Sequence, residues 1–318
     1  MSRIAILDDY FNGALDATDW SALDADDIDV FTEHLGHDED VIAKALEPYE
    51  ILIAMRERTP FPASLIEKLP NLKFLVTTGM RNLAIDMEAA RAGGIDIAGT
   101  DMLPYPAFEH AWALILAITK QIPLEDRTMK VGGWQKGTGV GLNGKTLGVL
   151  GLGKLGAQLA KVGQAFNMEV IAWSQNLTDE RCAEVGGVTR VSKDELFQRS
   201  DVISVHMILS DRTRGLVGAD ELALMKPSAY LINTSRGPIC DEAALLDALQ
   251  NRRIAGAGLD VFDVEPLPAD HPFRALDNAV LTGHTGYVIA ELYEKVYGQA
   301  VENITSWRAG QPTRLLNG

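Results

Sequence analysis

The stretch Gly151-Leu152-Gly153-Lys154-Leu155-Gly156 decides how this chain folds, because its three glycines stand between a predicted strand and a predicted helix. An apolar run at 146–150 precedes the stretch, and helical spacing follows over 157–161. Gly151 permits a tight turn, Gly153 lets the backbone approach a pyrophosphate, and Gly156 lets helix and strand pack closely. The helix start also offers unpaired N–H groups and a positive dipole end to phosphate. A dinucleotide-binding unit is therefore predicted to begin near the middle of the chain.

The composition is that of a globular protein with an acidic surface. Of 318 residues, 47% are hydrophobic and 23% are charged, and the formal net charge is −15. This excess of negative charge argues against nucleic acid and anionic membranes as partners, because both attract clustered Lys and Arg. Cys182 and Cys240 form neither a CxxC pair nor a metal-ligand spacing. We therefore expect no metal site, and reduced thiols in the cytoplasm.

The first hundred residues alternate short apolar strands with helical patterns. Such alternation predicts a parallel sheet that helices cover on both faces. The predicted strands are 4–7, 51–54, 74–77 and 95–98, and the predicted helices are 41–46, 63–69 and 87–92.

A second alternation of strands and helices begins at Lys145. Its six strands predict a doubly wound sheet that can bind a dinucleotide. A last helix, over 289–307, follows the completed sheet, so we expect it to return to the first domain. The predicted fold is α/β, with two doubly wound, Rossmann-like domains and the active-site cleft between them. Residues 1–101 plus about 288–318 form the predicted substrate domain, and residues 102–287 the dinucleotide-binding domain. The six strands are 146–150, 169–173, 202–206, 229–233, 256–260 and 279–282.

The segment between the two alternations predicts a helix, over 107–118, that is apolar nearly all round. A helix of this kind must be buried, so we expect it to lie between the domains or against a second subunit. The glycine-rich segment 131–144 predicts a loop. Helix and loop are together the candidates for a two-fold contact in a homodimer.

Three reactive side chains, those of Arg236, Glu265 and His284, lie just past predicted strands of the second half. In open α/β sheets, ligands bind outside the carboxyl ends of the strands. Arg236 can hold a carboxylate with two parallel hydrogen bonds, and His284 can donate a proton to a keto oxygen. Glu265 can accept the second ring N–H and favour the imidazolium. The three side chains form a complete set for reducing a 2-keto acid. Taken singly, Arg236 could instead cap a strand end, and Glu265 could be an ordinary loop carboxylate.

The chain resembles the D-isomer-specific 2-hydroxyacid dehydrogenases over nearly its whole length. The resemblance rests on Asp8-Asp9, 77–86, 108–111, the glycine stretch and, most specifically, 225–245. It implies that Arg236, Glu265 and His284 are the catalytic set.

The resemblance also implies ligand contacts beyond the catalytic set. Backbone N–H groups around Gly79 and Met80 would hold the substrate carboxylate, and Asp260 would bind the nicotinamide carboxamide. The segment 205–208 would lie along the adenine, with Thr213 nearby. The predicted cofactor contacts are Gly151, Gly153, Lys154, Leu155, Gly156, Ser174, Gln175, His206, Met207, Thr213, Thr234, Ser235, Asp260 and Gly286.

Two positions depart from the family pattern. Gly283 stands before His284, where the family usually has proline, so we expect a more mobile loop until substrate binds. An NAD enzyme places a carboxylate for the ribose at the end of strand 169–173, but this chain has Ser174 followed by Gln175. No carboxylate there repels a 2′-phosphate, and Arg181 is a candidate to attract one. The predicted cofactor is NAD(P)H, with a lean toward NADP.

Substrate size depends on the first domain, where Arg56, Arg58 and Arg81 follow predicted strands. Solvation is the simplest role for these arginines, but one that points inward would suit a second anionic or hydroxyl group. Arg56 is the predicted substrate contact, and His110, within its helix, is expected to be structural.

The predicted function is hydride transfer between NAD(P)H and a small 2-keto acid such as glyoxylate or hydroxypyruvate. Three alternatives stay open on the same fold. They are phosphite dehydrogenase, phosphoglycerate dehydrogenase and an NAD(H)-sensing corepressor that binds peptides.

Overall fold

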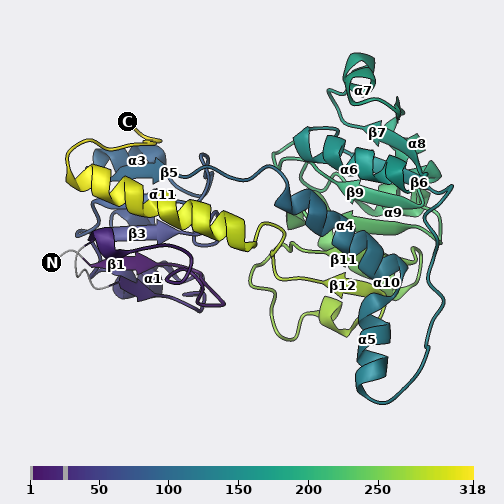
Figure 1. The fold of residues 1–318 in the computed structure, drawn as a ribbon, viewed down its shortest axis with the longest axis horizontal. Helices are drawn as coiled ribbons and strands as arrows, with labels where there is room; N and C mark the ends of the chain where they lie inside the picture. The colour runs from purple at the N-terminus through teal and green to yellow at the C-terminus, as the bar shows by residue number, and fades with distance from the viewer. Residues whose placement is uncertain (1–2, 24–27) are drawn as a thin grey trace. The chain divides into compact units, whose positions relative to one another are not determined.

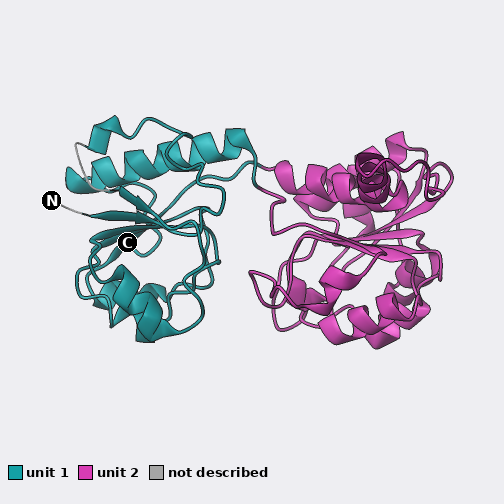
Figure 2. Ribbon diagram, turned by 90° about the horizontal axis from the view of Figure 1, so that it is seen from below, with its two compact units in different colours: residues 1–103, 288–318 teal, residues 104–287 magenta. Residues whose placement is uncertain are grey.

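Residues 3–23 and 28–318 are described by a computed structural model, in which the chain divides into two compact units (Figure 1, Figure 2). Unit 1 consists of Met1–Leu103 and Val288–Gly318, and unit 2 of Pro104–Tyr287. Each unit holds one parallel sheet with helices on both faces, which confirms the predicted α/β class with two Rossmann-like folds. The roles predicted for the two segments stay predictions.

The sheet of unit 1 has five parallel strands in the order β2-β1-β3-β4-β5. Four of these strands lie where the sequence predicts them, with ends shifted by at most one residue. The fifth, β2, is three half-buried residues long and therefore has no periodic pattern that predicts it. The strands are β1 Ile4–Ile6, β2 Ile28–Val30, β3 Ile51–Ala54, β4 Phe74–Thr77 and β5 Asp96–Gly99.

Helices cover both faces of this sheet (Figure 2). On one face, α1 (Glu39–Leu46), α2 (Ala63–Ile66) and α3 (Met87–Ala92) share a core with the strands. The other face carries α11 (Ala290–Arg308), the helix predicted over 289–307. The Trp307 ring of α11 stacks on Phe74 of β4 with ring centroids 4.9 Å apart, which ties the end of the chain to the centre of unit 1.

The sheet of unit 2 has seven parallel strands in the order β12-β11-β10-β9-β6-β7-β8. The prediction of six strands was wrong, because it missed the edge strand β8. The three residues of β8 are exposed or half-buried and show no apolar pattern. The strands are β6 Thr146–Leu150, β7 Glu169–Trp173, β8 Val188–Arg190, β9 Val202–Val205, β10 Tyr230–Asn233, β11 Gly256–Leu259 and β12 Ala279–Leu281.

Two apolar cores flank this sheet. One face packs against α8 (Lys193–Arg199), α9 (Ala219–Leu224) and α10 (Glu242–Gln250). The opposite face packs against α4 (Pro106–Thr119), α6 (Lys154–Ala165) and α7 (Asp179–Val185).

The apolar helix α4 is buried on one side by its own sheet. Ala111, Leu114, Ile115 and Ile118 of α4 share a core with strands and helices of unit 2 itself. The expected burial of this helix therefore comes in part from its own sheet, and its contact with the other domain or with a second chain stays a prediction. The next helix, α5 (Ile122–Lys130), was not predicted. None of the described helices combines the length and the hydropathy that crossing a bilayer requires.

Candidate active site and cofactor site

The predicted ligand contacts of unit 2 gather at one edge of its sheet. Arg236 follows β10, Glu265 follows β11 and His284 follows β12, and these three strands are neighbours. Parallel strands place their carboxyl ends at the same edge, so the three loops begin side by side. The glycine loop after β6 and the segment after β7 continue the same edge on the other side of β9.

The Glu265 carboxylate is hydrogen-bonded to the His284 ring. Nδ1 of His284 lies 2.6 Å from Oε2 of Glu265, and both side chains are half-buried. The other oxygen, Oε1, accepts the Phe262 N–H at 2.9 Å, so the carboxylate is fixed by its own loop. A carboxylate held in this way orients the imidazole and fixes which ring nitrogen faces it. The arrangement leaves Nε2 as the ring atom that a proton-transfer step would use.

Asp260 fastens the loop that carries His284. Its carboxylate is almost fully buried and accepts the Thr282 hydroxyl at 2.6 Å and the backbone N–H groups of Thr285 and Gly286 at 2.8 and 2.9 Å. The backbone carbonyl of Asp260 accepts the His284 N–H at 2.7 Å. Nε2 of His110 lies 3.2 Å from the same carboxylate. Burial acts to raise the pKa of Asp260, but the hydrogen bonds from His110 and Thr282 and the charge of His110 outweigh it and lower that pKa.

The backbone at His284 itself is unusual, with a φ of +54°. A non-glycine residue in this left-handed region costs on the order of 1–3 kcal/mol and persists where its surroundings hold it. Here the bonds to Asp260 hold the loop on both sides of His284. The expected mobility at Gly283 is therefore opposed by this fastening, and the positive φ falls on His284 instead of the glycine before it.

The Arg236 loop packs directly on the loop of Glu265. A Cβ on Gly237 would collide with the backbone carbonyl carbon of Phe262, so this contact requires glycine. The Asn233 side chain closes the turn, since it donates to the Arg236 carbonyl at 2.9 Å and accepts the Ser235 N–H at 3.0 Å. Nη1 of Arg236 donates to the Ser235 carbonyl at 2.7 Å. The predicted cofactor contact Ser235 uses its hydroxyl on the Val205 carbonyl, and Thr234 directly follows β10.

The glycine loop has the geometry of a phosphate cradle. Gly151 has a φ of +106°, donates its N–H to the Trp173 carbonyl at 2.9 Å, and would place a Cβ 2.5 Å from the His206 carbonyl oxygen. A Cβ on Gly156 would collide with the Gly151 carbonyl, so helix and loop are in close contact. By contrast, the space that a Cβ of Gly153 would enter is open, and α6 begins at the next residue, Lys154. The residues present thus fit a dinucleotide pyrophosphate.

Arg181, considered above as a partner for a 2′-phosphate, is engaged with the glycine loop. Its Nε and Nη2 donate to the carbonyls of Leu152 and Gly153 at 3.2 and 3.3 Å, and its Nη1 lies 3.1 Å from Glu184. Arg181 therefore braces the glycine loop from α7, and its donors are engaged there instead of being directed at a 2′-phosphate.

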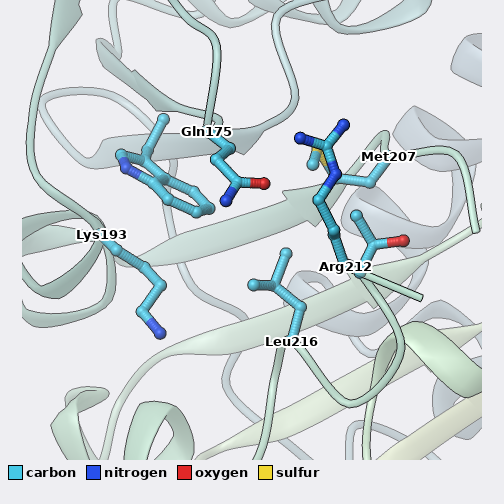
Figure 3. Close-up of a pocket in the computed structure, with 7 residues that line it drawn as sticks. Gln175, Lys193, Met207, Arg212 and Leu216 are labelled. Carbon is cyan, nitrogen blue, oxygen red and sulfur yellow. The ribbon is translucent and has the colours of Figure 1, made fainter. Parts of the chain in front are cut away.

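Beyond β7, a pocket of about 250 Å³ opens in unit 2 (Figure 3). Three of its lining residues, Gln175, Met207 and Thr213, belong to the predicted cofactor contacts. The Thr213 hydroxyl is used locally, because it donates to the Ile208 carbonyl at 2.7 Å. The other four lining residues were not predicted, because they come from three separate segments and share no local motif. They are Trp173, Lys193, Arg212 and Leu216.

His206, predicted beside the adenine, is a neutral histidine. Burial lowers its pKa from 6.5 to about 4, and its Nε2 lies 2.9 Å from the Ser204 hydroxyl. A histidine that is neutral when folded stabilises the protein above its unfolded pKa, and this contribution is lost as the pH falls toward the folded value.

We expect the protein to become less stable between about pH 7 and about pH 5 because of His206, by about 2 kcal/mol. His206→Gln retains a hydrogen-bonding group without a titrating ring, so its unfolding free energy should fall less over this range. Urea unfolding of the cofactor-free protein at both pH values measures this difference. Equal losses of stability in the two proteins would contradict the assignment.

The predicted substrate contacts of unit 1 form a separate cluster. The Arg56 side chain lies against Gly79, where a Cβ would collide with Nη1, and the guanidinium is 3.5 Å from Glu57. The Gly79 N–H donates to the Thr100 hydroxyl at 3.0 Å, so it is already in use, whereas the Met80 N–H has no hydrogen-bond partner among the described residues. Arg58 donates to the Asp8 carbonyl at 2.7 Å.

No group of three His, Cys, Asp or Glu side chains in the described part of the chain could hold a metal ion.

The profile of the family described as D-isomer specific 2-hydroxyacid dehydrogenase, NAD binding domain, matches residues 112–286. The chain belongs to this family. The match spans the glycine loop, Arg236, Glu265 and His284, which are the features that the fold brings to one sheet edge.

Relatives of known name agree with the family assignment. The chain is 36% identical over 290 residues to a glyoxylate reductase of Aeropyrum pernix, covering 88% of this chain and 86% of that one. It is 36% identical over 284 residues to a D-3-phosphoglycerate dehydrogenase of Archaeoglobus fulgidus, where it spans 53% of the relative's length. A crystal structure named as a D-3-phosphoglycerate dehydrogenase oxidoreductase from Ralstonia solanacearum superposes with a TM-score of 0.93 at 34% identity, covering 100% of this chain and 97% of the other.

This D-2-hydroxyacid dehydrogenase is therefore an oxidoreductase that acts on CH–OH donors. It transfers a hydride between a nicotinamide cofactor and a small 2-hydroxy or 2-keto acid.

Proposed function

We propose that this enzyme reduces hydroxypyruvate and glyoxylate with NADPH, giving D-glycerate and glycolate. The observation that carries the proposal is the 2.6 Å contact between Glu265 and His284. The two residues follow β11 and β12, and the loop of Arg236 follows the neighbouring strand β10. The glyoxylate reductase of Aeropyrum pernix, which matches over most of both chains, supports the choice of a small keto acid.

Each catalytic side chain has one task in this proposal. Arg236 binds the substrate carboxylate with two hydrogen bonds and so fixes the position of the keto carbon. Nε2 of His284 donates its proton to the keto oxygen, which becomes the hydroxyl of the product. Glu265, held by the Phe262 N–H, orients the ring so that Nε2 faces the substrate. The nicotinamide, when bound, supplies the hydride that reduces the keto carbon.

The remaining cofactor contacts bind and orient the dinucleotide. The N–H groups at the start of α6 and the open face of Gly153 would hold the pyrophosphate. Asp260 holds Thr285 and Gly286 in the loop next to the nicotinamide position. The preference for NADP is supported by Ser174 and Gln175 after β7, where no carboxylate stands to repel a 2′-phosphate.

In unit 1, the Arg56 guanidinium and the Met80 N–H are the proposed substrate contacts. Arg56 lies against Gly79, and the amide of Met80 is the next donor along this loop. A cation beside a backbone N–H suits a carboxylate or the hydroxyl of hydroxypyruvate. The same cation would suit a phosphate, so phosphoglycerate is the second candidate substrate.

The experiment that tests this proposal identifies the product. Hydroxypyruvate is converted with NADPH, and chiral chromatography resolves the glycerate formed. D-glycerate alone is expected, and L-glycerate or a racemic mixture would contradict the proposal. 3-Phosphoglycerate and phosphite, each offered with NADP⁺, test the alternatives in the oxidation direction. Faster oxidation of either compound than hydroxypyruvate reduction would assign the enzyme to that reaction.

A homodimer is also part of the proposal, with its contact on the arm formed by α5 and the loop 131–144. Four large apolar side chains of this arm are exposed, and Trp134 and Val131 are the most exposed of them, at 71% and 79%. Glu125 fastens the loop to the helix, since its carboxylate accepts the N–H groups of Lys136 and Gly137. An ordered apolar arm of this kind is typical of a protein–protein contact. The four side chains are Ile122, Met129, Val131 and Trp134.

Trp134→Glu combined with Val131→Glu is expected to convert the dimer to a monomer, because two charges would be buried without partners. Sedimentation velocity at micromolar protein concentration measures the oligomeric state. Val41→Glu, at an exposed apolar position of α1, is the matched control and should leave the dimer intact. A wild-type protein that sediments as a monomer would contradict the assignment.

A cytoplasmic location is the last part of the proposal. It is supported by Cys182 and Cys240, two buried free cysteines that a reducing compartment keeps as thiols.

A further inference from the structure

The pocket beyond β7 carries positive charge in a chain whose net charge is −15. Two of the seven residues that line it, Lys193 and Arg212, are cations, and none is a carboxylate. Apolar surface comes from Trp173, Met207 and Leu216. A small pocket with apolar walls and a cationic lining favours a ligand that is both flat and anionic.

The two cations of this pocket differ in what they contact. Nζ of Lys193 lies 2.6 Å from Oε1 of Glu221, which is 15% exposed, so the charge of this lysine is already neutralised. Arg212 forms no hydrogen bond or ion pair with any described residue. Figure 3 shows the Arg212 side chain extending beyond Leu216, and Gln175 and Met207 line the same pocket. Arg212 is therefore the cation of this pocket that is available to a ligand.

The pocket also lies where an adenosine ribose is expected. Trp173 lines the pocket, and its backbone carbonyl accepts the Gly151 N–H at 2.9 Å. The pocket therefore adjoins the glycine loop. In dinucleotide-binding folds, the ribose 2′ position is read at the end of the strand that follows the glycine loop and its helix. That strand is β7, and Ser174 and Gln175 come directly after it.

We infer that Arg212 binds the 2′-phosphate of NADP and is the residue that makes this enzyme prefer NADP to NAD. The guanidinium approaches from the loop after β9, and the Gln175 amide donates from the end of β7. The 2′-phosphate would take the place of the carboxylate partner that Arg212 lacks. This inference rests on the proposed NADP-dependent function and names the residue responsible, since Arg181 is engaged with the glycine loop.

The test compares two small probes that differ by the 2′-phosphate alone. Isothermal titration calorimetry measures the Kd of adenosine 2′,5′-bisphosphate and of AMP for the wild-type enzyme, for Arg212→Gln and for Arg214→Gln. Arg214 is an exposed arginine two residues away that does not line the pocket, so it is the matched control. Wild type should bind the bisphosphate more tightly than AMP. Arg212→Gln should lower this ratio by about ten- to a hundredfold, with little change in the Kd of AMP.

Three outcomes would overturn the inference. The first is an unchanged ratio in Arg212→Gln, and the second is an equal loss in Arg214→Gln. In the third, wild type binds AMP as tightly as the bisphosphate. Activity with keto acids separates these failures from a failure of the proposed function. If Arg212→Gln leaves the ratio unchanged while wild type still reduces hydroxypyruvate with NADPH, the inference alone is wrong. If wild type binds neither probe and reduces no keto acid, both are wrong.

Discussion

His284→Ala is expected to lower kcat for hydroxypyruvate by about two to four orders of magnitude, the range typical of losing a general acid. The physical reason is that no other described side chain is placed by a 2.6 Å contact with Glu265 to deliver a proton at this sheet edge. Substrate binding should change far less, because Arg236 supplies the contact to the carboxylate. Steady-state rates of NADPH oxidation measure kcat and KM separately.

Two further variants make the His284 result specific. His37→Ala removes an exposed histidine of unit 1 and should leave kcat unchanged. Glu265→Gln should lower kcat by less than His284→Ala. The double variant should be no slower than His284→Ala, because the two residues act as a unit. A His284→Ala enzyme with near-normal kcat would exclude this histidine as the proton donor.

Arg236→Lys is expected to lower kcat/KM by about two to three orders of magnitude, although the charge is kept. A guanidinium holds a carboxylate with two parallel hydrogen bonds, and an ammonium cannot reproduce this geometry. The loss should appear in KM for both glyoxylate and hydroxypyruvate, because both carry the carboxylate. It should also appear in kcat, because a poorly oriented keto carbon meets the hydride less often.

The control for this variant is Arg190→Lys, in which the exposed pair of Arg190 with Asp179 is altered on the surface of unit 2. Such a surface pair contributes little to stability, so the kinetics of the Arg190→Lys enzyme should match those of wild type. If Arg236→Lys retained the wild-type KM, the carboxylate would have to be held elsewhere, and the Met80 N–H with Arg56 would become the main candidate.

Much of the fold could be predicted because its patterns are local. The glycine stretch 151–156 marks a strand, a turn and a helix start within a few residues. Most strands of both sheets are buried apolar runs with sharp ends. The two strands that were missed, β2 and β8, are three residues long and lack buried faces. Helix α4 was found, but sequence periodicity does not show which surface buries a helix, and one side of α4 packs on its own sheet.

The candidate site was predictable to the extent that strand ends determine it. Arg236, Glu265 and His284 each follow a strand, and the strand order makes their loops neighbours. Residues that join the site across long sequence separations could not be found in this way. His110 contacts Asp260 from helix α4, and Arg212 enters the pocket beyond β7 from a loop after β9. Nor does the sequence indicate that the positive φ falls on His284 instead of Gly283.

This enzyme is expected to reduce small 2-keto acids with a nicotinamide cofactor at the sheet edge that carries Arg236 and His284. The most direct test measures initial rates with NADPH and with NADH against glyoxylate, hydroxypyruvate, pyruvate and 2-ketoglutarate. We predict rapid oxidation of NADPH with hydroxypyruvate and glyoxylate, and slower oxidation of NADH. An enzyme that binds the reduced cofactor but oxidises it with none of these keto acids would show that this sheet edge carries out another reaction.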